Sequence, residues 1–137
     1  MPLLNPFVCS IHSCLRLLGK DRLSRLSREQ ALFARDEDDG MPLLEIVKKY
    51  KPTVLLGLTA VGGLFGEELI NEMAKECERP IIFSLSNPTT KAECTAEQAF
   101  EWTDGKCIFA SGSPFDPVLH EGRTFYPSQC NNSKSDV

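Results

Sequence analysis

Three short polar segments contain the residues of this chain that could bind or react with a small molecule. They are Gly57–Gly63 (GLTAVGG), the pair Ser86 and Asn87, and Ser111–Phe115 (SGSPF), and each follows an apolar run. An asparagine amide offers both a donor and an acceptor, which suits a hydroxyl, a carboxylate or a carboxamide. Pro88 favours an extended backbone at Asn87 and so restricts where its side chain points. These segments predict a hydrogen-bonding site for a small polar ligand.

Each segment also has a plainer interpretation. Gly57–Gly63 could be only a tight turn between a strand and a helix, and it does not match the dinucleotide fingerprint G-x-G-x-x-G. Asn87 could form an Asx-turn or cap a helix, and the segment from Ser111 could be an ordinary turn. The functional interpretation depends on all three segments meeting at one place.

The surrounding pattern alternates between helices and strands. Helical spacing of apolar residues predicts helices over 42–50, 64–78 and 95–103, the last with Thr95 as N-cap and Asp104-Gly105 as its stop. Short continuous apolar runs predict a strand over 52–58 that is buried on both faces, a second buried strand over 80–85, and a third strand over 106–111. The remainder, from Gly112 onward, is expected to be loop-like.

This order predicts an α/β fold with a parallel sheet covered by helices. Right-handed crossovers place the carboxyl ends of all its strands at one edge, where open α/β sheets bind ligands. We therefore expect Thr59, Asn87 and Ser111 to lie along one edge of the sheet.

The composition narrows the class of protein. The 137 residues suit one domain, and 42% hydrophobic with 25% charged residues is ordinary for a globular protein. A net charge of −4 gives no reason to expect a nucleic-acid partner, and no apolar run approaches the ~18 residues of a membrane span. The six cysteines form no C-x-x-C pair, which favours free thiols in a reducing compartment.

Ionisable residues offer little chemistry. His120 lies in a predicted turn and is expected to be a solvated loop histidine. The acidic run Asp36–Asp39 is typical of a solvated linker, although it could also be taken for a cation cluster. Phe100 and Trp102 are expected to pack in the core. We assign no catalytic residue and no metal ligand.

Two long segments, however, resemble the malic enzyme family. They are 51–118, with RPIIFSLSNPTTKAECTAEQ and IFASGSPFDPV in this order and spacing, and 122–132 (GRTFYPSQCNN). The resemblance implies an incomplete Rossmann-like, nicotinamide-binding domain with three recognisable strands. It also implies oxidative decarboxylation of malate to pyruvate and carbon dioxide, with NAD or NADP and a divalent Mn²⁺ or Mg²⁺ ion.

The resemblance assigns roles to individual residues. Asn87 is similar to the family asparagine that contacts substrate and nicotinamide, and Asn131 and Asn132 match the asparagines of its malate-binding G-Q-G-N-N segment. The resemblance gives dinucleotide contacts to Leu58, Thr59 and Leu85 as well as Asn87.

The chain also departs from the family pattern. The G-Q-G-N-N segment reads Ser-Gln-Cys-Asn-Asn over 128–132, and the family's tyrosine–lysine acid–base pair, acidic metal ligands and G-x-G-x-x-G turn have no counterpart. We predict a divergent segment over 1–19, a partial NAD(P)-binding domain over 20–132 and a divergent tail over 133–137. A truncated product, a fragment or a mis-assembled gene would explain this pattern.

Two functions follow from these observations. The chain is either a part of a malic enzyme that carries dinucleotide and malate contacts, or a catalytically inactive binding or interaction module. Gln30 lies near the position where the resemblance gives NADP-using relatives a lysine for the 2′-phosphate, so a neutral glutamine there favours NAD. The resemblance also implies that the parent enzyme is a homo-oligomer. An Arg- and Ser-rich start interrupted by Asp21 and Glu29 leaves the cytoplasm or an organelle (mitochondrion or plastid) as the expected compartment, and secretion is not expected.

Overall fold

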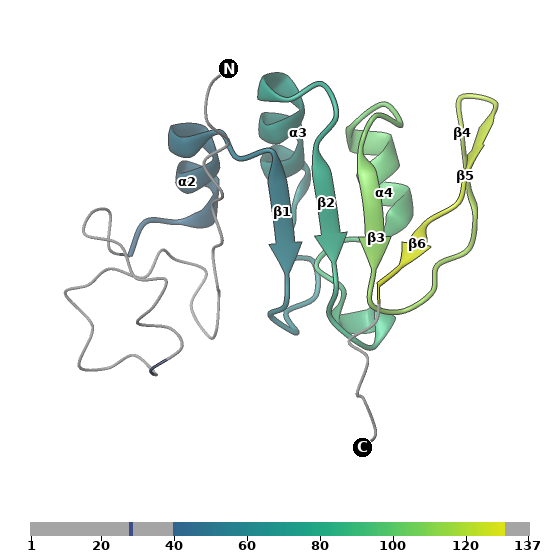
Figure 1. Ribbon diagram of the computed structural model, residues 1–137, viewed down its shortest axis with the longest axis horizontal. Coiled ribbons are helices and arrows are strands. Elements are labelled where there is room, and N and C mark those ends of the chain that lie inside the picture. The colour runs from purple at the N-terminus through teal and green to yellow at the C-terminus, as the bar shows by residue number, and fades with distance from the viewer. Residues whose placement is uncertain (1–27, 29–39, 131–137) are drawn as a thin grey trace.

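A parallel β-sheet forms the centre of the computed structural model, which describes residue 28 and residues 40–130. Strands β1 (Val54–Gly57), β2 (Ile81–Ser84) and β3 (Ile108–Ser111) lie side by side in chain order (Figure 1). A two-residue strand, β6 (Ser128–Gln129), extends the sheet next to β3, and every pair is parallel. The predicted Rossmann-like α/β fold is confirmed, with a fourth short strand that the sequence did not indicate.

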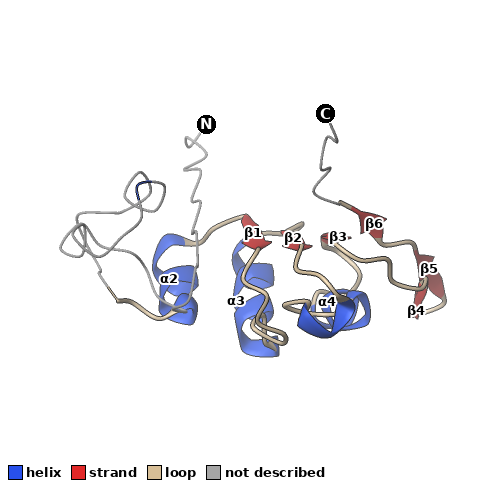
Figure 2. Ribbon diagram, turned by 90° about the horizontal axis from the view of Figure 1, so that it is seen from below, coloured by secondary structure: helices blue, strands red, loops and turns tan. Residues whose placement is uncertain are grey.

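The helices lie on one side of this sheet. Figure 2 shows α2 (Leu43–Tyr50), α3 (Glu67–Glu76) and α4 (Ala96–Trp102) in a single layer below the strands. A 3-10 turn, η2 (Thr89–Lys91), lies between β2 and α4. A helix thus precedes each of the strands β1, β2 and β3, as the alternating pattern predicts.

The start of α4 is defined by its side chains. Thr95 Oγ1 accepts a hydrogen bond from Gln98 N at 3.1 Å, and Thr95 N donates to Gln98 Oε1 at 3.0 Å. This reciprocal capping box satisfies two backbone donors that a helix end would otherwise leave free. The helix is followed by Asp104 and Gly105, both with positive φ. The predicted cap and stop are confirmed.

Helix α3 begins three residues later than predicted. Gly63 has a φ of 72°, and Gly66 has an extended backbone at the N-cap, so Leu64 and Phe65 belong to the preceding turn. Phe65 is nevertheless buried, and its N–H donates to the Glu93 carbonyl at 2.9 Å. The helical spacing of Leu64 and Phe65 therefore reflects packing of a turn against the core.

The core lies between the sheet and the helix layer. Its fully buried members Ile70, Ile82 and Ala99 come from α3, β2 and α4. On the opposite face, Val54 and Ile108 are 37% and 39% exposed. The prediction that the first strand is buried on both faces is wrong, because the described helices cover only one face and leave Val54 and Leu56 of β1 exposed.

This open face should bind hydrophobic dyes and promote self-association. It carries exposed apolar side chains from two strands, namely Val54, Leu56 and Ile108. Changing all three to threonine, which keeps β-propensity, should reduce 8-anilinonaphthalene-1-sulfonate fluorescence and the sedimentation coefficient at high concentration. A wild-type chain that stays monomeric without binding the dye would contradict this prediction.

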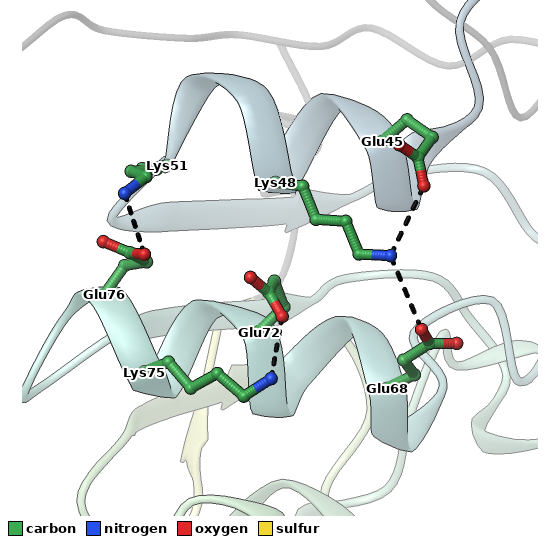
Figure 3. A network of polar contacts seen from close by, with 7 residues as sticks. All are labelled: Glu45, Lys48, Lys51, Glu68, Glu72, Lys75 and Glu76. Atoms are coloured by element: carbon green, nitrogen blue, oxygen red, sulfur yellow. Dashed lines mark hydrogen bonds and ion pairs between the residues drawn. The ribbon is translucent and has the colours of Figure 1, made fainter.

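Helices α2 and α3 also contact one another through charged side chains (Figure 3). Lys48 lies 3.4 Å from Glu45 on its own helix and 3.6 Å from Glu68 on α3, and Lys51 lies 2.8 Å from Glu76. These pairs are exposed, so water and salt screen them. The attachment of the two helices therefore depends on the apolar residues beneath.

The segment expected to be loop-like contains regular structure. Strands β4 (Val118–His120) and β5 (Arg123–Phe125) form an antiparallel hairpin, whose two-residue loop Glu121-Gly122 has positive φ at both positions. The Phe125 ring stacks on Phe100 at 4.7 Å between centroids. The prediction of a loop is wrong here, because contact with α4 stabilises strands too short to show a sequence pattern.

His120 was expected to lie solvated in a turn, but it is half-buried in a strand. It lies in β4, its ring centroid is 6.5 Å from that of Phe125, and its buried Nε2 has no hydrogen-bond partner. The packing of the hairpin against α4 accounts for this burial.

Candidate functional site at the carboxyl edge of the sheet

Three polar segments meet at one edge of the sheet, as predicted. The last residues of the first three strands, Gly57, Ser84 and Ser111, are aligned in register across parallel pairs. The segments that follow them therefore begin side by side. Ser111 itself is 1% exposed and donates from Oγ to the Ser113 carbonyl at 2.8 Å, so Ser113 is the more accessible serine.

A buried carboxylate, Glu93, connects two of these segments. It is 0% exposed, and its Oε1 accepts hydrogen bonds from Thr59 N and Thr59 Oγ1, both at 2.9 Å, and from Ser86 Oγ at 2.5 Å. Its Oε2 accepts one from Ser84 Oγ at 3.1 Å. Since an unpaired buried charge is costly, these four bonds are what makes the burial of Glu93 tolerable.

The strand end is shaped to admit this carboxylate. A Cβ on Gly57 would lie 2.4 Å from Glu93 Cδ and 2.6 Å from Oε2, well inside van der Waals contact. Only glycine therefore allows Glu93 to lie against the end of β1. The first glycine of GLTAVGG accommodates a protein side chain.

The pKa of Glu93 depends on two opposed effects. Burial alone raises the pKa of this carboxyl, but hydrogen bonds from Ser86 and Thr59 favour the ionised form and outweigh it. The pKa therefore lies below the ordinary value of 4.5. Glu93 is a carboxylate at neutral pH.

Acidification should destabilise the chain through Glu93. A lowered folded-state pKa contributes stability that is fully present above the unfolded pKa and is lost as pH falls through the folded one. We expect the melting temperature of the wild type to decrease as the pH drops below about 4.5. Glu93→Gln should melt at a lower temperature than the wild type at pH 7, and its melting temperature should decrease less on acidification. Calorimetry from pH 7 to pH 3 measures both, with the exposed Glu101→Gln as control. Parallel profiles for wild type and Glu93→Gln would contradict this assignment.

Asn87 lies exposed at the same edge. Its Oδ1 accepts a hydrogen bond from Ser113 Oγ at 2.5 Å, which fixes the orientation of the side-chain amide. The peptide bond between Asn87 and Pro88 is cis. Beneath it, a Cβ on Gly112 would lie 2.3 Å from the Leu85 carbonyl oxygen and 2.9 Å from Asn87 Nδ2. The segments after β2 and β3 are therefore packed too closely for any residue but glycine at position 112.

The other predicted contact residues lie at or near this edge. Leu58 is 55% exposed, and Thr59 and Leu85 are half-buried. The Thr59 hydroxyl already donates to Glu93 and accepts from Val61 N. The cofactor and substrate roles given to these residues and to Asn87 remain predictions.

Some sequence-based assignments fall outside the described residues. These are Gln30, the acidic run Asp36–Asp39, Asn131 and Asn132. The domain boundaries at 19/20 and 132/133 likewise remain predictions.

Sequence reasoning did not single out Glu93. A weak signal exists in the sequence, because Glu93 stands between the small apolar residues Ala92 and Cys94. A charged residue flanked by small apolar ones suggests burial with partners, yet the sequence alone does not identify those partners.

The described residues fit a dinucleotide better than a metal. An exposed, oriented amide at Asn87 and exposed apolar side chains at Leu58 and Val61 lie at the ligand-binding edge of an α/β sheet. Within 28 and 40–130, no three or more histidine, cysteine or acidic residues are grouped so as to hold a metal ion. The cysteines described there, namely Cys77, Cys94, Cys107 and Cys130, are free thiols. Burial raises the pKa of Cys94 to about 12, so it stays protonated.

The fold and the edge define a Rossmann-like α/β domain with a ligand-binding edge. Comparison with known proteins agrees: the family profile described as "Malic enzyme, NAD binding domain" matches residues 15–134. The chain belongs to the malic enzyme family.

Individual relatives show the same likeness. The chain is 53% identical over 118 residues to an NADP-dependent malic enzyme of Dictyostelium discoideum, covering 85% of this chain and 22% of the relative. It is 51% identical over 119 residues to a hydrogenosomal malic enzyme of Neocallimastix frontalis (87% and 20%), and 52% over 98 residues to an NAD-dependent malic enzyme of Vibrio parahaemolyticus (72% and 17%). The chain thus spans about a fifth of the length of these relatives.

Proposed function

We propose that the chain binds the nicotinamide dinucleotide of a malic enzyme along the carboxyl edge of its sheet. Asn87 contacts both the nicotinamide and malate, Leu58, Thr59 and Leu85 contact the dinucleotide, and Asn131 contacts malate. The observation that carries this proposal is the exposed Asn87 amide, held by Ser113 at the edge where α/β sheets bind ligands.

The reaction of the whole enzyme is then oxidative decarboxylation of malate to pyruvate and carbon dioxide. A bound nicotinamide dinucleotide would supply the acceptor for the hydride from the malate hydroxyl carbon. Asn87 orients the two reactants through its donor and acceptor, which lowers the entropy cost of bringing them together. The described residues do not fit the divalent ion that the family uses, because no three of their histidine, cysteine or acidic side chains are grouped.

Removing the Asn87 amide should weaken dinucleotide binding about tenfold, because the loss of one or two hydrogen bonds reduces the binding free energy by about 1.4 kcal/mol. Titration of the chain with NAD⁺ and with NADP⁺, followed by calorimetry, measures the change for Asn87→Ala. Asn71→Ala removes the same amide from helix α3 and should leave affinity unchanged. Equal affinity of both variants would refute the role of Asn87, and no binding by wild type would refute the proposed function.

The second candidate is a catalytically inactive binding or interaction module. The exposed apolar face with Val54, Leu56 and Ile108 favours it, because such a surface suits contact with another protein. Malate-dependent NAD(P)H formation with Mn²⁺ tests the second candidate, which requires that the chain has no activity. We expect no turnover by the isolated chain, in which no counterpart of the tyrosine–lysine pair is recognised, and measurable turnover would exclude the inactive module.

Several accompanying properties are proposed on the same basis. Gln30 leans toward NAD, although the names of the relatives include both NAD- and NADP-dependent enzymes. We propose a homo-oligomeric parent enzyme in the cytoplasm or an organelle, with malate as the small-molecule partner and with neither nucleic acid nor membrane as a partner. Within the described part of the chain, no helix is long and apolar enough to cross a membrane.

A further inference from the structure

The loop after β1 has three consecutive backbone N–H groups, and each has a partner inside the protein. Thr59 N donates to Glu93 Oε1 at 2.9 Å, Ala60 N to Ser86 Oγ at 2.8 Å, and Val61 N to Thr59 Oγ1 at 3.1 Å. The two hydroxyls that accept from Ala60 and Val61 in turn donate to the same Glu93 oxygen. All three N–H groups are thus directed, directly or through one hydroxyl, to a single carboxylate oxygen.

Successive backbone N–H groups in a turn form the kind of concavity that binds anions such as phosphate. In this loop Ala60 has a φ of 56°, a conformation that L-residues rarely adopt. A loop held in such a conformation needs surrounding structure that compensates for its cost. Here the compensating partner is the fully buried Glu93, which comes from a segment 34 residues away in the chain.

We propose that Glu93 is a positioning residue that occupies the anion-binding concavity of the Thr59–Val61 loop, in the place where a ligand phosphate would otherwise bind. Through Ser86 the same carboxylate also fixes the residue immediately before Asn87. The loop therefore contributes the exposed apolar side chains of Leu58 and Val61 to the ligand edge, and no phosphate contact. The statement that the ligand at this edge is a dinucleotide rests on the proposed function.

The N–H groups themselves test the proposal by NMR. In the wild type, inorganic pyrophosphate should leave the amide signals of Thr59, Ala60 and Val61 unmoved. In Glu93→Gln the signals of these backbone amides should shift, and their hydrogens should exchange with solvent at least tenfold faster. The reason is that the neutral glutamine side chain replaces the carboxylate that all three N–H groups share, directly or through one hydroxyl, as acceptor. Glu101→Gln makes the same change at an exposed site and should reproduce the wild-type spectrum. Wild-type shifts with pyrophosphate, or unchanged amides in Glu93→Gln, would overturn the proposal.

A second variant covers the case in which Glu93→Gln does not fold. Glu93→Ala removes the internal anion, and sodium formate should then restore the wild-type amide signals by supplying a small carboxylate, whereas sodium chloride at equal ionic strength should not. Failure of formate to restore them would count against the anion role.

Dinucleotide affinity provides the functional measurement. Glu93→Gln should weaken NAD(P)⁺ binding about tenfold, and formate should recover most of it in Glu93→Ala. If the wild type binds no dinucleotide, the proposed function fails while the NMR measurement still decides the role of Glu93. If the amides respond but the affinity does not, the positioning role is refuted.

Discussion

Replacing Gly112 with alanine should cost about 3 kcal/mol of stability, near the upper end for overpacking. The added carbon would lie 2.3 Å from the Leu85 carbonyl oxygen, which is backbone and cannot rotate away. It would also lie 2.9 Å from Asn87 Nδ2, so relief of the clash displaces the amide proposed to orient the ligand. Urea denaturation measures the stability change, and we expect dinucleotide binding to be lost with it.

Gly66→Ala is the matched control for this variant. No atom lies within 4 Å of a Cβ at Gly66, and its φ of −73° suits any residue. Because Gly66 is the N-cap of α3, we expect a cost below about 1 kcal/mol. Similar losses for the two alanines would show that the segments after β2 and β3 are not packed as closely as described.

Replacing Phe109 with alanine should cost roughly 3–5 kcal/mol, a large share of the 5–15 kcal/mol that stabilises an ordinary domain. Phe109 is 4% exposed and makes edge-on contacts with Phe100 at 6.0 Å and Phe115 at 6.2 Å between ring centroids. Its removal leaves a cavity between β3 and α4 that the rings around it cannot fill. The midpoint of urea denaturation should fall accordingly.

The neighbouring residue provides an internal comparison. Ile108 precedes Phe109 on β3 but faces the open side of the sheet and is 39% exposed. Ile108→Ala should therefore cost only about 1 kcal/mol, chiefly through β-propensity and partial burial. Equal costs at both positions would mean that the two faces of the sheet are equally covered.

The alternation of helices and strands and the N-cap at Thr95 could be predicted from the sequence. Both are local properties, because periodicity and capping involve residues a few positions apart. The meeting of the strand ends at one edge was also predictable, since alternating helices and strands indicate a parallel sheet, in which all carboxyl ends lie at the same edge. Short strands such as β6 were not, because two residues carry no periodicity.

The sequence by itself thus determined the fold class, the alternation of helices and strands along the chain, and the edge at which Thr59 and Asn87 lie. Only the tertiary structure decided which face of the sheet is open and where Glu93 lies. Its contact with Thr59 spans 34 residues, and the clearance that Gly57 provides exists only once β1 and β2 are paired. Local sequence encodes local conformation, whereas the partners of a buried charge depend on which distant segments the folded sheet brings together.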